Sequence, residues 1–167
     1  MIPLHNPQDI RIIPYRSELQ PAFERLNLGW LKQYDLLEEE DLKYLHDPDR
    51  HIVQQGGQVF FALSVEEVVG TCAAIRLNAC IFELAKLAVE PNFRRRGLGR
   101  LLSETVISFA RQSGATQVVL TSNSALKEAI LLYESLGFNH TPMPPEIRYR
   151  TANVYMTREV GERKNHS

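Results

Sequence analysis

The stretch VEPNFRRRGLGRLL, Val89 to Leu102, decides how this chain folds. An apolar segment, CIFELAKLAV, leads into it, and an amphipathic segment, RLLSETVISFARQ, leads out of it. We therefore expect a strand over Cys80–Val89 and a helix that begins near Gly99. The first turn of a helix has unpaired backbone N–H groups and carries the positive end of the helix dipole, so this junction favours a bound anion.

The residue types at the junction suit a phosphate. Gly97 and Gly99 lack Cβ atoms, so the backbone can approach an anion closely. A P-loop would need Gly-Lys-Ser/Thr here, and a dinucleotide-binding turn would need a glycine where Leu102 stands. A basic, solvated turn is the alternative interpretation. The arginines that can donate charge-assisted hydrogen bonds to a phosphate are Arg94, Arg95, Arg96 and Arg100.

Two segments of the chain resemble the GNAT superfamily of acyl-CoA N-acyltransferases. Arg94-x-x-Gly97-x-Gly99, between a strand and a helix, resembles the pyrophosphate loop of that family. TSNSALKEAILLYESLGF, Thr121 to Phe138, resembles the closing half of the family's core. The resemblance covers about Val68 to His140, and the first two expected helices match the family by position only. The matching positions of the second segment are Asn123, Ala129, Leu132, Tyr133, Gly137 and Phe138.

The resemblance implies an α/β (α+β) domain of the GNAT fold. We expect a mixed, mostly antiparallel sheet of about six to seven strands, about four helices, and a central parallel pair of strands splayed around CoA. One domain should span residues 1–167, with a disordered tail over 159–167. The expected strands are Ile10–Tyr15, Gln58–Ser64, Val68–Leu77, Cys80–Val89, Gln117–Ser122, one from Phe138, and Ala152–Thr157. The expected helices run from an N-cap at Ser17 to Tyr34, over Glu38–Leu45, from Gly99 to Gly114, and over Ala125–Leu136.

The composition excludes several classes of protein. The 167 residues carry a formal net charge of -1, whereas nucleic-acid binding needs a large basic excess. The start of the chain lacks a signal-peptide pattern and no apolar run is long enough to span a membrane, so we expect a cytoplasmic protein. Cys72 and Cys80 are expected to be buried, reduced thiols, and without a Cys/His cluster at zinc spacing we expect no metal.

The resemblance also implies a site for acetyl-CoA. The pyrophosphate would lie against residues 94–100, Leu98 included, and the pantetheine arm would pair with the backbone of Leu87, Ala88 and Val89. Asn123 would hydrogen-bond that arm. Tyr133 would protonate the departing sulfur, although a core tyrosine with a satisfied hydroxyl is the alternative.

Glu83 is the candidate general base. It interrupts the apolar run IFELA and, by the period of two in a strand, should share a face with Ala85 and Leu87. A carboxylate there is costly unless it is paired or belongs to a site, and partial burial would raise its pKa. The alternative is an ion pair with Arg76 or Lys86.

The function that the resemblance implies is acetyl transfer from acetyl-CoA to a primary amine of a small molecule or amino acid. A protein acetyltransferase and a non-catalytic acyl-CoA-binding module are the alternatives, and a homodimer is left open. Arg76, Trp30, Tyr34 and the loop Met143–Arg150 are expected to flank the mouth of the acceptor pocket. Within that loop, Arg148 or Arg150 would bind an acceptor carboxylate.

Overall fold

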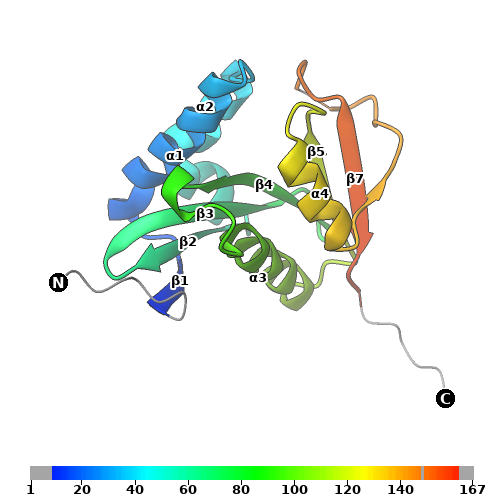
Figure 1. Ribbon diagram of the computed structural model, residues 1–167. Helices are drawn as coiled ribbons and strands as arrows, with labels where there is room; N and C mark the ends of the chain where they lie inside the picture. The colour runs from blue at the N-terminus through cyan, green and yellow to red at the C-terminus, as the bar shows by residue number, and fades with distance from the viewer. Residues whose placement is uncertain (1–8, 148, 162–167) are drawn as a thin grey trace.

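The computed structural model describes residues 9–147 and 149–161, and within them a single mixed sheet has the strand order β1-β2-β3-β4-β5-β7-β6 (Figure 1). Strands β4 and β5 are parallel, and the other neighbouring strands are antiparallel. The expected fold class is therefore confirmed. The strands are β1 (Ile10–Pro14), β2 (Gln58–Ser64), β3 (Glu67–Arg76), β4 (Ile81–Val89), β5 (Gln117–Ser122), β6 (Asn139–His140) and β7 (Val154–Glu159).

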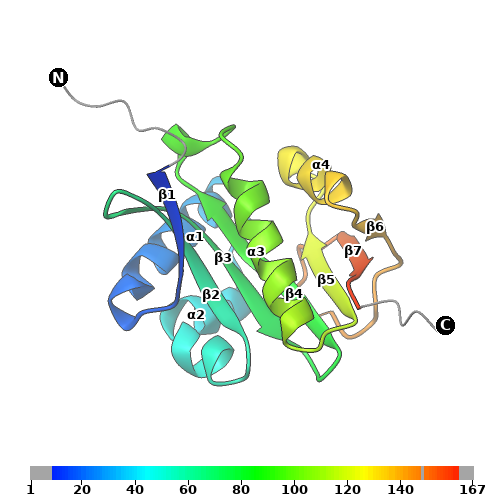
Figure 2. The same ribbon diagram turned by 90° about the horizontal axis from the view of Figure 1, so that it is seen from below.

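Helices cover both faces of the sheet (Figure 2). On one face, Phe23 of α1 and Leu45 of α2 belong to one buried cluster with Phe61 of β2. On the other face, Leu102 and Val106 of α3 pack with β4, because apolar residues recur along α3 at helical spacing. The α-helices of this part of the chain are α1 (Gln20–Gln33), α2 (Glu39–His46), α3 (Leu98–Gln112) and α4 (Lys127–Ser135); a π-helical turn spans Asp49–Val53.

The connections explain the order of the strands. Short turns join β2 to β3 and β3 to β4, so these strands can only be antiparallel neighbours. The connection from β4 to β5 contains α3, which is long enough to cross over and return parallel. The junction between β4 and α3 thus follows the central strand of the sheet, at the end of β4 that lies beyond its pairing with β5.

A β-bulge in β4 changes which residues face each helix layer. The register between β3 and β4 shifts at this point, and Lys86 in the bulge has a φ of 56°. Ala85 packs into the α1-side cluster, whereas Leu87 packs into the α3-side cluster. The expectation that Leu87 shares a face with Glu83 is therefore wrong, because the period of two holds only along an unbroken ladder.

Three further expectations fail at the ends of elements. A 3-10 turn over Ser17–Leu19 precedes α1 and makes no side-chain cap, so Ser17 is not the N-cap. Cys80 is exposed in the turn before β4, although Cys72 is buried as expected. The disordered tail expected over 159–167 is wrong for its first two residues, since β7 includes Glu159 and Val160 is 4% exposed. Residues 162–167 of that tail lie outside the described residues.

Candidate active site

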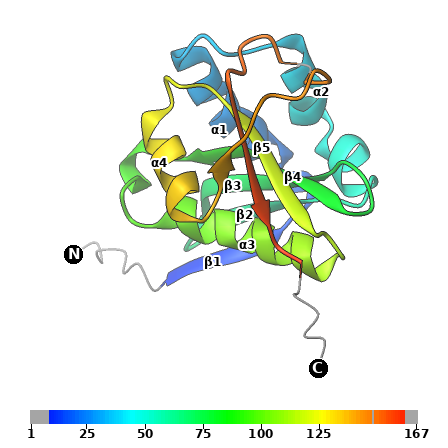
Figure 3. The same cartoon turned by 90° about the vertical axis from the view of Figure 1, so that its right-hand side faces the viewer.

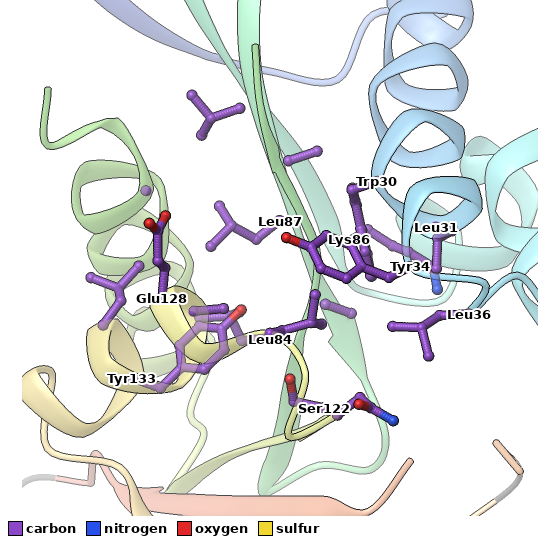
Figure 4. A pocket seen from close by; sticks show the side chains of 18 of the residues that line it. Trp30, Leu31, Tyr34, Leu36, Leu84, Lys86, Leu87, Ser122, Glu128 and Tyr133 are labelled. Carbon is purple, nitrogen blue, oxygen red and sulfur yellow. The ribbon is translucent and has the colours of Figure 1, made fainter. Parts of the chain in front are cut away.

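The parallel strands β4 and β5 separate soon after they pair. Their register covers residues 81–83 of β4 and 117–119 of β5, although both strands continue beyond these pairs. A cavity of about 580 Å³ fills the resulting gap and is lined by the rest of β4 and by residues 121–123. Figure 4 shows Leu84 and Leu87 bordering it between Tyr133 on one side and Trp30 on the other. The expected splayed parallel pair is confirmed.

The edge of β4 that faces the gap has free backbone groups. The N–H of Glu90 donates to the carbonyl of Val69 on β3, at 2.8 Å. Since successive residues of a strand direct their N–H groups to opposite sides, those of Val89 and Leu87 point into the gap, and that of Ala88 points towards β3. The side chain of Arg94 also reaches the gap, where its Nε donates to the carbonyl of Val89 at 3.4 Å.

The cavity extends to the N-terminus of α3. Gly97 is the N-cap and has a φ of 79°, a conformation that L side chains rarely adopt. No hydrogen bond of the described residues uses the backbone N–H groups of residues 95–100. A Cβ on Gly99 would lie 3.2 Å from Leu132 Cδ2, so this glycine keeps the wall of the cavity open. A row of unpaired N–H groups at a helix N-terminus is a site for an anion.

The arginines of the loop have different positions. Arg94, Arg95 and Arg100 line the cavity, as do Gly97, Leu98 and Gly99. Arg95 and Arg100 also contact side chains of α4, at 3.5 Å from Glu128 and 2.6 Å from Ser135 respectively. Arg96 instead lies 5.0 Å from the ring centroid of Phe93 and is not a lining residue. The structure thus brings together every expected loop residue except Arg96.

Glu83 lies on the α1 side of β4, since it is two residues before Ala85 and ahead of the bulge. Burial raises the pKa of its carboxyl to about 7, and the nearby charge of Lys86 opposes this rise. Within residues 9–147 and 149–161 it forms no salt bridge. The alternative that Glu83 pairs with Arg76 or Lys86 is therefore wrong, and its carboxyl remains available in the cavity wall.

Lys86 forms a buried ion pair with Asp41 of α2. The two side chains are 7% and 3% exposed, and the Lys86 Nζ lies 5.1 Å from the ring centroid of Tyr149 and 3.5 Å from its hydroxyl. Sequence reasoning missed this cluster. The spacing of Glu38 and Asp41, which form a capping box, could have located the start of α2. Nothing local signals the partner of Lys86, which is 45 residues away.

Tyr133 is buried at 7% exposure, and its ring packs edge-on against Phe138 at 6.0 Å. Figure 4 shows its hydroxyl directed into the cavity. That hydroxyl makes no hydrogen bond to any residue that the structure describes. Burial raises the pKa of the phenol above its ordinary value of 10.0, so the group stays protonated at neutral pH.

Asn123 lines the cavity, but its side chain has partners within the protein. Its Nδ2 donates to the carbonyl of Thr151 at 2.7 Å, and its Oδ1 accepts from the N–H of Ala125 at 2.9 Å. The residue therefore ties the end of β5 to the turn before α4 and to the loop before β7. One amide proton and one oxygen lone pair remain for a ligand.

The expected mouth of the acceptor pocket is found in part. Trp30 and Tyr34 line the cavity, whereas Arg76 is exposed and does not. Arg150 is also exposed and does not line it, and Arg148 lies outside the described residues. The loop is held by Glu38, whose carboxylate accepts the N–H groups of residues 150 and 151 at 2.9 and 3.1 Å. Burial raises the pKa of this carboxyl, but the hydrogen bonds from the loop outweigh that effect and lower it overall.

Among the residues that the structure describes, each helix is too short or too polar to span a membrane, and no three His, Cys, Asp or Glu side chains are grouped so that they could bind a metal ion.

A family model described as the acetyltransferase (GNAT) domain matches residues 55–140. Human N-acetyltransferase 8B is 32% identical over 118 residues, which are 67% of this chain and 51% of that protein. The chain spans about half or less of the length of the curated relatives that it matches.

Solved structures with low sequence identity share the fold. A GNAT family acetyltransferase from Staphylococcus aureus Mu50 has a TM-score of 0.81 at 21% identity, covering 90% of this chain and 99% of its own. One from Elizabethkingia anophelis, with acetyl-CoA bound, has a TM-score of 0.63 at 21% identity, covering 90% and 98%. With the family model and the splayed strands in agreement, this chain belongs to the GNAT superfamily of acyl-CoA N-acyltransferases.

Proposed function

We propose that the protein transfers an acetyl group from acetyl-CoA to a primary amine of a small molecule, by direct attack of the amine on the thioester. One observation carries the proposal. The gap between β4 and β5 joins the unpaired N–H groups at the start of α3 to a wall containing both Glu83 and Tyr133. An anion site, a strand edge, a base and an acid along one cavity suit this reaction.

The start of α3 would hold the pyrophosphate of acetyl-CoA. The backbone N–H groups of residues 95–100 donate to its oxygens, and Arg94, Arg95 and Arg100 add charge. The free edge of β4 at Leu87 and Val89 pairs with the amide groups of the pantetheine arm. The N–H of Leu87 or a neighbour then polarises the thioester carbonyl as it becomes an oxyanion.

Glu83 acts as the base in this scheme. An amine that arrives as an ammonium must lose a proton before it can attack, and a carboxyl with a pKa of about 7 accepts that proton near neutral pH. The transfer is direct or passes through a water molecule. The lack of an ion pair among the described residues leaves the carboxylate free for this role.

Tyr133 acts as the acid. Its protonated hydroxyl donates to the sulfur as the C–S bond breaks, so CoA departs as a thiol. The apolar surroundings that raise the pKa of the phenol also raise the pKa of the CoA thiol, so the pKa values of the two groups stay close.

The test is acetyl-CoA binding by calorimetry, followed by thiol release across a panel of amines, amino acids and peptides. We expect binding and amine-dependent release with small amines. Release with peptides alone would favour a protein acetyltransferase instead. Binding without release for every acceptor would favour a non-catalytic acyl-CoA-binding module, and no binding would overturn the proposal.

A further inference from the structure

The side of the cavity towards α1 and α2 has a mostly apolar wall. The wall consists of Leu26, Trp30, Leu31, Tyr34 and Leu36. Trp30 is held in place by Asn27, a fully buried residue whose Oδ1 accepts the indole N–H at 2.9 Å. Because the indole N–H is already hydrogen-bonded within α1, the rest of the Trp30 ring is a preorganised apolar surface.

The charges on this side leave no free cation among the described lining residues. Lys86 is the cation that β4 contributes, and its charge is compensated by Asp41. Its Nζ is further enclosed by Tyr149, at 3.5 Å from the hydroxyl. The carboxyl of Glu83 has no ion-pair partner in this part of the chain. An acceptor carboxylate here would meet two acidic groups and a cation that is already paired, which disfavours it.

The loop before β7 bounds the same side of the cavity. Tyr149, Thr151 and Ala152 line it, and the carboxylate of Glu38 binds the Thr151 hydroxyl at 2.6 Å. Figure 3 shows this loop reaching α2 across the end of the sheet. Because the loop is tied to α2 beside the cavity, a compact acceptor fits this side better than a polypeptide that must pass out of it.

From these features we infer that the acceptor is a small primary amine with an aromatic or branched apolar group and no carboxylate beside the amino group. The apolar group lies against Trp30 and its neighbours on α1, and the nitrogen faces Glu83. This inference rests on the proposed function and narrows it. It also reverses the expectation that Arg148 or Arg150 selects amino acids by binding a carboxylate.

The experiment compares 2-phenylethylamine, phenylalaninamide, phenylalanine and a peptide with N-terminal phenylalanine, by thiol release from acetyl-CoA. After correction for the fraction of neutral amine, kcat/KM for phenylethylamine should exceed that for phenylalanine by about 100-fold, since the site selects against a buried unpaired charge. Phenylalaninamide matches phenylalanine in size without the charge, so it should stay within about tenfold of phenylethylamine. Equal rates for phenylalanine and phenylethylamine, or a preference for the peptide, would overturn the inference.

Two variants test the wall itself. Trp30→Ala should lower kcat/KM for phenylethylamine by about tenfold or more, through loss of apolar contact, and leave the Kd of acetyl-CoA unchanged. Leu28→Ala is the control, because Leu28 belongs to the same helix as Trp30 and is packed in the same cluster, but does not line the cavity. Equal losses in both variants would overturn the role of Trp30. If phenylalanine were preferred and Arg148→Ala removed that preference, the carboxylate clamp would hold and the inference would fail. If no acceptor released thiol, the proposed function would fail with it.

Discussion

Glu83 should make the protein less stable as the pH rises, and Glu83→Gln should remove that effect. Glu83 is half-buried, and desolvation raises the pKa of its carboxyl to about 7 in the folded protein, against an ordinary value of 4.5. At low pH the group is protonated whether the chain is folded or unfolded. Between about pH 4.5 and 7 the unfolded chain ionises first, so stability falls, and above pH 7 the penalty is constant. At 1.36 kcal/mol per pKa unit, the full penalty has a ceiling of about 3 kcal/mol.

The assay is urea unfolding of the wild type and Glu83→Gln at pH 4, 5.5 and 8. The difference in unfolding free energy between variant and wild type should grow in favour of the variant by about 2–3 kcal/mol from pH 4 to pH 8. Packing changes caused by the glutamine are the same at each pH, so they cancel from this comparison. Glu66→Gln, at an exposed position in the turn between β2 and β3, is the control and should show no such growth. A constant difference for Glu83→Gln across the range would refute a carboxyl held at raised pKa.

Three kinetic and binding predictions follow from the same site. Glu83→Gln should lower kcat/KM most at and below pH 7. Above pH 7 this loss relative to the wild type should shrink by about tenfold per pH unit, because free amine accumulates. A loss independent of pH would point to a role of Glu83 in acceptor binding or structure instead. Gly97→Val should weaken acetyl-CoA binding by about tenfold or more in calorimetry, because a β-branched residue strains the N-cap of α3. Gly114→Val is the control, since Gly114 has a comparable φ of 93° beyond the other end of α3, and it should leave the acetyl-CoA affinity unchanged. Equal losses of affinity in the two variants would contradict binding of acetyl-CoA at the loop before α3. Tyr133→Phe should lower kcat by about 100-fold or more in the thiol-release assay with unchanged acetyl-CoA affinity, whereas Tyr155→Phe, outside the cavity lining, should not; unaltered kcat in Tyr133→Phe would exclude it as the acid.

Features encoded in neighbouring residues could be predicted from the sequence. The junction around Gly97 follows from an apolar strand, glycines and an amphipathic helix in succession. The parallel pairing of β4 and β5 follows from the helix between them. The inward hydroxyl of Tyr133 agrees with its place in the LYESLGF segment.

Features that depend on distant partners could not be predicted. The bulge at Lys86 reversed the faces of β4 because a single extra residue breaks a period of two without any change in composition. Asp41 is an ordinary acidic helix residue in the sequence, and only the fold places it against Lys86. Likewise, Thr151 and Ala125 occupy much of the Asn123 side chain, which the motif alone assigned to the cofactor arm.

In the proposed reaction, one cavity brings acetyl-CoA and a primary amine together for transfer. The most direct measurement uses acetyl-CoA with an isotopically labelled acetyl group, followed by mass spectrometry of the amine and titration of free CoA thiol. We expect one labelled acetyl group on the amine nitrogen for each thiol released, with both signals reduced together in Tyr133→Phe. Thiol release without labelled amine, or acetyl-CoA that binds tightly and is never consumed in the presence of small amines, would contradict it.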